Sequence, residues 1–279
     1  MQAAKSASKL RLLTRPCHRC SSTLRTAQTP HPALTVYPDY LSSAEQSLLL
    51  KHSLRLLDSP SRTTSAGRKR RREWVKANPS WDGRGFMADE AYAWEEGHFD
   101  GVIKQYREML VREGMWEKVA EGDEQAGLAE ALEKVYSLLP PSEPTSQPPS
   151  PSSSLSPPPH LIMHLLHLSS RGAIYPHVDN LEAFGRTIVG ISLGGERIMR
   201  FKQVNEPHEG MIKDGPREFE VLLEAGSAYV QAEPLRTHYT HEVLEKGEWE
   251  GRAVGGTQRL SIMLRASGPH ACSRSLKPY

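Results

Sequence analysis

The chain has 279 residues, a hydrophobic content of 38%, 21 prolines and a formal net charge of +2. This length allows one large domain or one domain with tails, and the near-neutral charge gives no ground for a general polycationic nucleic-acid binder. No run of 18 apolar residues occurs, so no membrane span is expected, and three cysteines exclude a disulfide framework and favour a reducing compartment.

Residues 1–35 are predicted to be a mitochondrial transit peptide or a disordered tail. The first 38 residues contain no Asp or Glu and carry six Lys or Arg residues among Ser, Thr and Ala. This composition is typical of mitochondrial targeting, whereas a secretory signal would need an apolar core. Targeting is favoured over a plain basic tail, and the expected compartment is the mitochondrial matrix. Cys17 and Cys20 have zinc-like spacing, but no second pair exists, and both would leave with the targeting peptide.

Residues 36–139 are predicted to form a helical N-terminal region. Ser42 and Glu45 make a candidate capping box ahead of leucines at helical spacing. Helical periodicity is also predicted over 99–116 and 126–139. His98 and Asp100 begin the first of these stretches. Because side chains two residues apart on a helix point in different directions, this pair is expected to be structural rather than metal-binding.

The basic run "GRKRRREW", residues 67–74, is a candidate nucleic-acid patch or nuclear signal, although a solvated charged turn is favoured. Residues 140–159 are nearly all Pro and Ser and are predicted to be a linker. After it, short β-like runs predict a core over 160–267 and a tail over 268–279. Strands are expected at 160–169, 186–194, 197–204, 219–231, 240–244 and 258–267. Closely spaced strands without intervening helices favour a sandwich or a rolled double sheet, so the fold class is α+β.

The segment "YPHVDN" contains a candidate metal site. On an extended chain His177 and Asp179 face the same side, so both can reach one ion. A third ligand is expected from a distant strand, and "RTHYTHEVL" offers His238 and His241. Spacing alone does not choose between them, but His241 leads directly into the alternating "HEVL" and is better anchored. Two histidines and one carboxylate on one face form the arrangement of non-haem Fe(II) sites.

A second candidate site lies in "QRLSIMLRAS". The alternation places Arg259, Ser261 and Arg265 on one strand face, and Leu260, Ile262 and Leu264 on the other. Two arginines on a buried strand are costly unless an anion meets them, and guanidinium groups bind carboxylates in a bidentate manner. A dicarboxylate such as 2-oxoglutarate would use both. A pair of solvent-facing arginines on an edge strand is the alternative.

Five motifs in order, "HLLHLSSRGAIYPHVDN", "GISLGGERIMRF", "LLEAGSAYVQ", "HYTHEVL" and "RLSIMLR", resemble the AlkB-like Fe(II)/2-oxoglutarate-dependent dioxygenases. The resemblance is greatest to the mitochondrial branch, the seventh AlkB homologue. It covers residues 160–267 well and 40–110 faintly. It implies a double-stranded β-helix (jelly roll) core preceded by N-terminal helices. It also implies that 2-oxoglutarate and O2 react at Fe(II) to give succinate, CO2 and oxidation of a substrate C–H bond.

The same resemblance implies roles for individual residues. Iron would be held by His177, Asp179 and His241, and 2-oxoglutarate would contact Tyr229, Arg259, Ser261 and Arg265. Arg259 would take the distal carboxylate, and Arg265 would lie near the carboxylate that binds iron. The sequence departs from the family pattern at Ala225, where the family has Pro.

The resemblance leaves the substrate open. Base-demethylating members of the family carry a β-hairpin ahead of the core that grips a flipped base. No hairpin is predicted between Trp81 and Pro159, so no duplex DNA substrate is expected. A protein or metabolic substrate in mitochondria is favoured, and the resemblance implies a role in mitochondrial cell death or fatty-acid metabolism. An RNA demethylase that uses the basic run at 67–74 is the alternative.

Two further classes of protein compete with a dioxygenase. A non-catalytic scaffold would keep the fold and bind a partner, but it does not need the metal and arginine positions. A zinc hydrolase would need a general base near the metal. Glu242 adjoins His241 but is expected on the opposite strand face, and a hydrolase leaves Arg259 and Arg265 unexplained.

Overall fold

The computed structural model describes residues 25–59, 64–97, 101–120, 122–139, 155–179, 185–204 and 215–266. The predictions for residues 1–24 and 268–279, for the pair His98 and Asp100, and for most of the Pro/Ser linker lie outside the described residues. The predicted division into a region at 36–139 and a core at 160–267 stays a prediction. One sheet crosses that division, because strands on both sides of the linker pair with each other.

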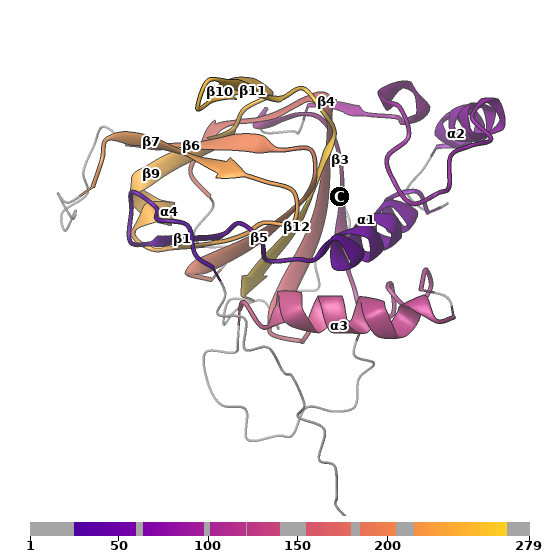
Figure 1. Ribbon diagram of the computed structural model, residues 1–279, viewed down its shortest axis with the longest axis horizontal. Coiled ribbons are helices and arrows are strands. Elements are labelled where there is room, and N and C mark those ends of the chain that lie inside the picture. Colours follow the sequence, from indigo (N-terminus) through magenta and orange to yellow (C-terminus); the bar gives the residue numbers. More distant parts are fainter. Residues whose placement is uncertain are drawn as a thin grey trace, which may run out of the picture.

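Ten strands form one sheet that curls on itself (Figure 1). The sheet order is β1 (Leu34–Tyr37), β8 (Ala228–Ala232), β5 (Thr187–Gly194), β12 (Arg259–Ala266), β4 (Leu161–His177), β9 (Tyr239–Val243), β6 (Arg197–Gln203) and β7 (Glu218–Leu223). β3 (Ile103–Val111) also pairs with β4, and β2 (Glu95–Gly97) pairs with β3. β10 (Lys246–Trp249) and β11 (Arg252–Gly255) form a separate ribbon. The described pairs are antiparallel, and the α+β class and the jelly-roll core are as predicted.

β4 connects the two parts of the curled sheet. Its first half, from Leu161 to Leu168, pairs with β12. Its end pairs with β9 at Ile174 and His177, and the register shifts between these two residues. The sequence predicted a strand that ends near residue 169, because Ser, Arg and Gly interrupt the apolar run. The strand continues because Gly172 allows β3 to approach: an added Cβ would lie 2.8 Å from the Gln105 carbonyl oxygen.

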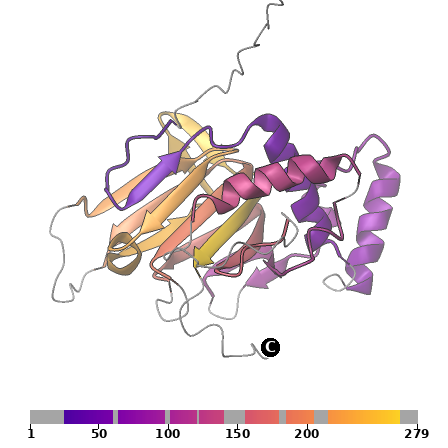
Figure 2. The same cartoon turned by 90° about the horizontal axis from the view of Figure 1, so that it is seen from below.

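Two helices cover the face of the sheet opposite the cavity described below. α1 (Ser43–Leu57) and α3 (Glu124–Tyr136) lie side by side against this face (Figures 1 and 2). The predicted capping box of α1 is confirmed: the Ser42 backbone N–H donates to the Glu45 carboxylate at 2.6 Å, and the Glu45 N–H donates to Ser42 Oγ at 3.3 Å. Between helices and sheet lies an apolar core that includes Leu49, Leu132 and Ile262.

The helix predicted over 99–116 is wrong. Residues 103–111 form β3, and β2 and β3 are an antiparallel hairpin, so the prediction of no hairpin between Trp81 and Pro159 is also wrong. Pairing with β4 decides the conformation: Met109 and Val111 pack under the helices, whereas Tyr106 packs on the other face of the sheet. The sequence argument against duplex DNA therefore loses its basis.

The basic run is a helix rather than the favoured charged turn. α2 (Ser65–Ala77) begins at Thr64, whose side chain accepts a hydrogen bond from the Gly67 N–H. Short helices η1 (Asp89–Ala91) and α4 (Leu235–His238) complete the described elements, and α4 lies between strands where no helix was expected. Among the described helices, none has the length and apolar content to cross a membrane.

Candidate metal and co-substrate site

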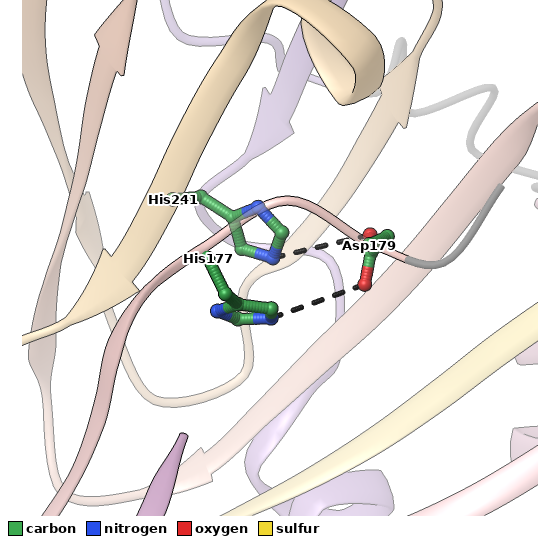
Figure 3. A group of neighbouring side chains, drawn as sticks. All are labelled: His177, Asp179 and His241. Atoms are coloured by element: carbon green, nitrogen blue, oxygen red, sulfur yellow. Dashed lines mark ion pairs between the residues drawn. The ribbon is translucent and has the colours of Figure 1, made fainter. Parts of the chain in front are cut away.

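The ends of β4 and β9 bring His177, Asp179 and His241 together (Figure 3). His177 and His241 are register partners, and their ring centroids lie 4.3 Å apart. Asp179 follows two residues after His177, and its two carboxylate oxygens lie 3.9 Å from His177 Nε2 and 3.9 Å from His241 Nε2. One candidate ligand atom from each residue falls within 4.8 Å of the others. This spacing lets all three side chains reach one ion.

The protonation and hydrogen bonding of this triad suit Fe(II). Burial lowers the pKa of His241 to about 4, so its imidazole is neutral at neutral pH, which metal binding requires. His177 Nδ1 lies 2.9 Å from the Tyr175 carbonyl oxygen, and a neutral ring that donates from Nδ1 to this oxygen presents the lone pair of Nε2 on the side of Asp179. Asp179 Oδ2 is buried without a hydrogen-bond partner, which is costly unless a cation meets it.

The structure brings His241, not His238, to the other two residues. His238 is the last residue of α4 and lies near His31. Burial lowers the pKa of His31, and the charge of His238 lowers this pKa further. Glu242 lies on the opposite face of β9 from His241, as expected, where it accepts a hydrogen bond from Arg200 at 3.2 Å. It is therefore not placed to act as a general base beside the triad.

β12 contributes its polar face to the cavity beside the triad. Arg259, Ser261, Met263 and Arg265 line this cavity, together with Tyr229, Gln231 and an apolar set consisting of Ile103, Leu166, Ile174, Ile188, Met199 and Val243. Leu260, Ile262 and Leu264 are fully buried on the opposite face, as the alternation predicted. β12 is an inner strand between β4 and β5, and Arg259 is only 1% exposed. The alternative of solvent-facing arginines on an edge strand is therefore wrong.

The polar groups of the cavity are mostly donors. Arg259 Nε donates to Ser192 Oγ at 2.9 Å, and burial lowers the pKa of Arg259. Ser261 Oγ and Gln231 Nε2 are buried without a hydrogen-bond partner. Burial raises the pKa of Tyr229, so its phenol stays protonated and can donate. Guanidinium, hydroxyl and amide groups around one cavity suit a carboxylate ligand.

Two residues of the site were not predicted from the sequence. Gln231 alternates with Tyr229 on β8, so the period of two could have indicated it. Arg236 is fully buried, and its Nε lies 3.6 Å from Asp179 Oδ2. No periodic pattern in "EPLRTHY" indicates Arg236, because a four-residue helix carries it.

The fold and this site define a class of enzyme, and the chain belongs to the 2OG-Fe(II) oxygenase superfamily, which it matches over residues 33–265. Members of this superfamily use Fe(II), 2-oxoglutarate and O2.

Within the superfamily the chain is similar to alpha-ketoglutarate-dependent dioxygenase alkB homolog 7, mitochondrial. The Bos taurus protein is 34% identical over 106 residues, which cover 37% of this chain and 44% of that protein. The Mus musculus protein is 29% identical over 176 residues, 62% of this chain and 65% of that protein. The chain thus matches less than two thirds of either relative's length. The predicted resemblance to the AlkB-like family and its mitochondrial branch is confirmed.

Among solved structures, that of OsALKBH1 is similar with a TM-score of 0.43 and 14% identity. The similarity covers 86% of this chain and 99% of that one.

Proposed function

We propose that the chain is an Fe(II)/2-oxoglutarate-dependent dioxygenase of the mitochondrial matrix. His177, Asp179 and His241 hold the iron, and Tyr229, Arg259, Ser261 and Arg265 bind 2-oxoglutarate. One observation carries the proposal: three candidate ligand atoms within 4.8 Å of one another line the same cavity as a buried arginine. Neither a zinc hydrolase nor a scaffold requires a buried arginine in this cavity.

Each residue has a distinct task. Bound Fe(II), with 2-oxoglutarate and O2, supplies the oxidation of a substrate C–H bond while 2-oxoglutarate becomes succinate and CO2. Arg259, oriented by Ser192, binds the distal carboxylate, and Tyr229 donates a hydrogen bond to it. Arg265 Nη2 lies 3.7 Å from Asp179 Oδ1. This position places Arg265 near the carboxylate of 2-oxoglutarate that would bind the iron. Ile174 and Val243 form part of the apolar wall of the cavity, where the substrate C–H bond would lie.

The proposed prime substrate is a protein side chain or a metabolite. Three large hydrophobic residues are exposed in the described part of the chain, and two of them, Tyr175 (45%) and Val178 (38%), flank His177. Exposed apolar side chains next to a reactive centre favour contact with an apolar group. A role in mitochondrial cell death or fatty-acid metabolism, which the family resemblance of the sequence motifs implies, is part of the same proposal.

An RNA demethylase is the second candidate, because two observations support it. The hairpin of β2 and β3 adjoins the cavity, which Ile103 of β3 lines. α2 carries Arg68, Arg72 and Lys76 four residues apart, all exposed on one side of the helix. Such a row can contact phosphates without reading sequence.

The two candidates are separated by succinate release measured in air with Fe(II) and 2-oxoglutarate. Peptide pools, metabolite pools and pools of base-methylated RNA are added in turn, and mass spectrometry detects the gain of one oxygen atom or the loss of a methyl group. The first proposal expects peptides or metabolites to stimulate succinate release and RNA to have no effect. RNA-stimulated release that falls at least tenfold in the double variant Arg68→Glu/Arg72→Glu, with basal release unchanged, would establish the second candidate.

A further inference from the structure

Arg236 is a buried charge that the proposed roles leave unused. It lies in α4, is fully buried, and its Nε and Nη2 have no hydrogen-bond partner. A buried guanidinium is costly unless an opposite charge and good hydrogen bonds offset its desolvation. The candidate partner is Asp179, whose Oδ2 is likewise buried without a hydrogen bond.

Each of the two carboxylate oxygens of Asp179 lies near one histidine and one arginine. Oδ1 lies 3.9 Å from His177 Nε2 and 3.7 Å from Arg265 Nη2. Oδ2 lies 3.9 Å from His241 Nε2 and 3.6 Å from Arg236 Nε. Each carboxylate oxygen therefore faces one imidazole and one guanidinium. Arg265 lines the co-substrate cavity, whereas Arg236 is not among the residues that line it.

Arg236 also contacts the chain on the far side of residues 180–184. Its Nη1 donates to the carbonyl oxygen of Gly185. One guanidinium thus contacts Asp179 before this segment and Gly185 after it. The helix that carries Arg236 is well anchored, because Leu235 is fully buried in the apolar core beneath it, which includes residues of β6, β7, β8 and β9. The His238 N–H also donates to the Pro234 carbonyl at 3.0 Å.

We propose that Arg236 is a positioning residue for the metal centre: it holds the Asp179 carboxylate in place through Oδ2 and the adjoining backbone through Gly185. The inference rests on the proposed function, since it assumes that Asp179 is an iron ligand. Groups that orient metal ligands typically contribute 10–100-fold to metal affinity. Loss of Arg236 should therefore weaken Fe(II) binding in the absence of 2-oxoglutarate, which a defect in co-substrate binding would not do.

The test is anaerobic Fe(II) titration of the full chain against a competing chelator, without 2-oxoglutarate. We expect the Fe(II) Kd to rise 10–100-fold in Arg236→Gln and to recover in part in Arg236→Lys. Arg197→Gln is the matched control, because Arg197 is also fully buried with unpartnered Nε and Nη1, but its Nη2 donates to the carbonyls of Ser169 and Thr257. The control should lose thermal stability and keep the Fe(II) Kd.

The outcomes separate this inference from the proposed function. If the wild type fails to bind Fe(II), the proposed function fails and the inference with it. If the wild type binds and folded Arg236→Gln binds within twofold, the positioning role is overturned while the proposed function stands. If Arg236→Gln does not fold, Arg236→Met takes its place and is titrated with Co(II): an unchanged Kd and visible spectrum overturn the role, and a weaker Kd with an altered spectrum supports it.

Discussion

Tyr229 reaches the cavity because residue 190 is glycine. Tyr229 and Gly190 are register partners on β8 and β5, and an added Cβ at position 190 would lie 2.3 Å from the phenol ring. The ring thus crosses β5 toward β12. Gly190→Ala should displace it and weaken 2-oxoglutarate binding about tenfold or more, since a hydrogen bond to a charged group contributes roughly 1.5–3 kcal/mol. Anaerobic titration of the Fe(II)-loaded protein measures this.

Gly97→Ala is the control for the effect of adding a methyl group to a strand glycine. Its Cβ would meet only the Ile103 carbonyl oxygen, at 3.8 Å. It should leave the 2-oxoglutarate Kd unchanged. Equal affinity of Gly190→Ala and wild type would show that Tyr229 does not contact the co-substrate.

His164 should make the protein sensitive to acid. Burial lowers its pKa to about 4, and the positive charge of Arg265 adds to the effect. As the pH falls below 6.5, His164 becomes protonated in the unfolded chain, whereas in the folded chain it stays neutral until about pH 4. The free energy of unfolding therefore falls as the pH falls through this range. The loss is roughly 1.4 kcal/mol per unit of pKa difference. Urea unfolding at pH 7 and pH 5 should show a smaller loss for His164→Gln than for wild type, and an equal loss would contradict this account.

The strand face on which a residue lies was predictable where a strand period controls it. His177 and Asp179 are two residues apart on extended chain, and Arg259 and Arg265 alternate with buried leucines, so their common face followed from the pattern. Arg236 could not be predicted in this way. Its position depends on a turn of helix between strands and on an ion pair with Asp179, 57 positions earlier in the chain.

At the scale of elements, β3 shows why periodicity alone was insufficient. Residues 103–111 place apolar side chains at spacings that fit both a helix and a strand, and the pairing with β4 selects the strand. That partner lies beyond the Pro/Ser segment, so no local window of sequence contains it. β1 is a similar case, since it pairs with β8, about 190 residues later.

One carboxylate joins three elements of the N-terminal half. Asp58 follows α1, and its oxygens lie 2.7 Å from Arg107 Nη1 on β3 and 3.2 Å from Arg71 Nη2 on α2. Asp58→Ala leaves Arg107 buried without its charge partner, and this should lower the free energy of unfolding by about 3–5 kcal/mol. Urea unfolding measures the change.

The control for Asp58→Ala is Glu73→Gln, which breaks the exposed pair between Lys69 and Glu73 on α2. An exposed pair contributes little, so the change should stay within about 0.5 kcal/mol. A similar small effect in both variants would mean that Asp58 does not hold these elements together.

At the scale of the molecule, the two faces of the curled sheet have different roles: one packs the apolar core and the other carries the candidate site. α1 and α3 cover one face of the sheet (Figure 2) with an apolar core between. The cavity on the other face is lined by the triad and by Arg259 and Arg265 of β12. The short spacing of strands after Pro159 predicted this rolled sheet. The contribution of the first half was missed, because β1 and β3 complete the sheet only through long-range pairing.

The central claim is that one cavity binds Fe(II) through His177, Asp179 and His241, and 2-oxoglutarate through Arg259 and Arg265 of β12. The most direct test is stepwise anaerobic titration of the full chain with Fe(II) and then 2-oxoglutarate, alongside His177→Ala and Arg259→Ala. We predict one Fe(II) and one 2-oxoglutarate per wild-type chain, loss of iron binding in His177→Ala, and retained iron binding with at least tenfold weaker 2-oxoglutarate binding in Arg259→Ala. Iron binding that survives His177→Ala, or 2-oxoglutarate affinity that survives Arg259→Ala, would contradict the account.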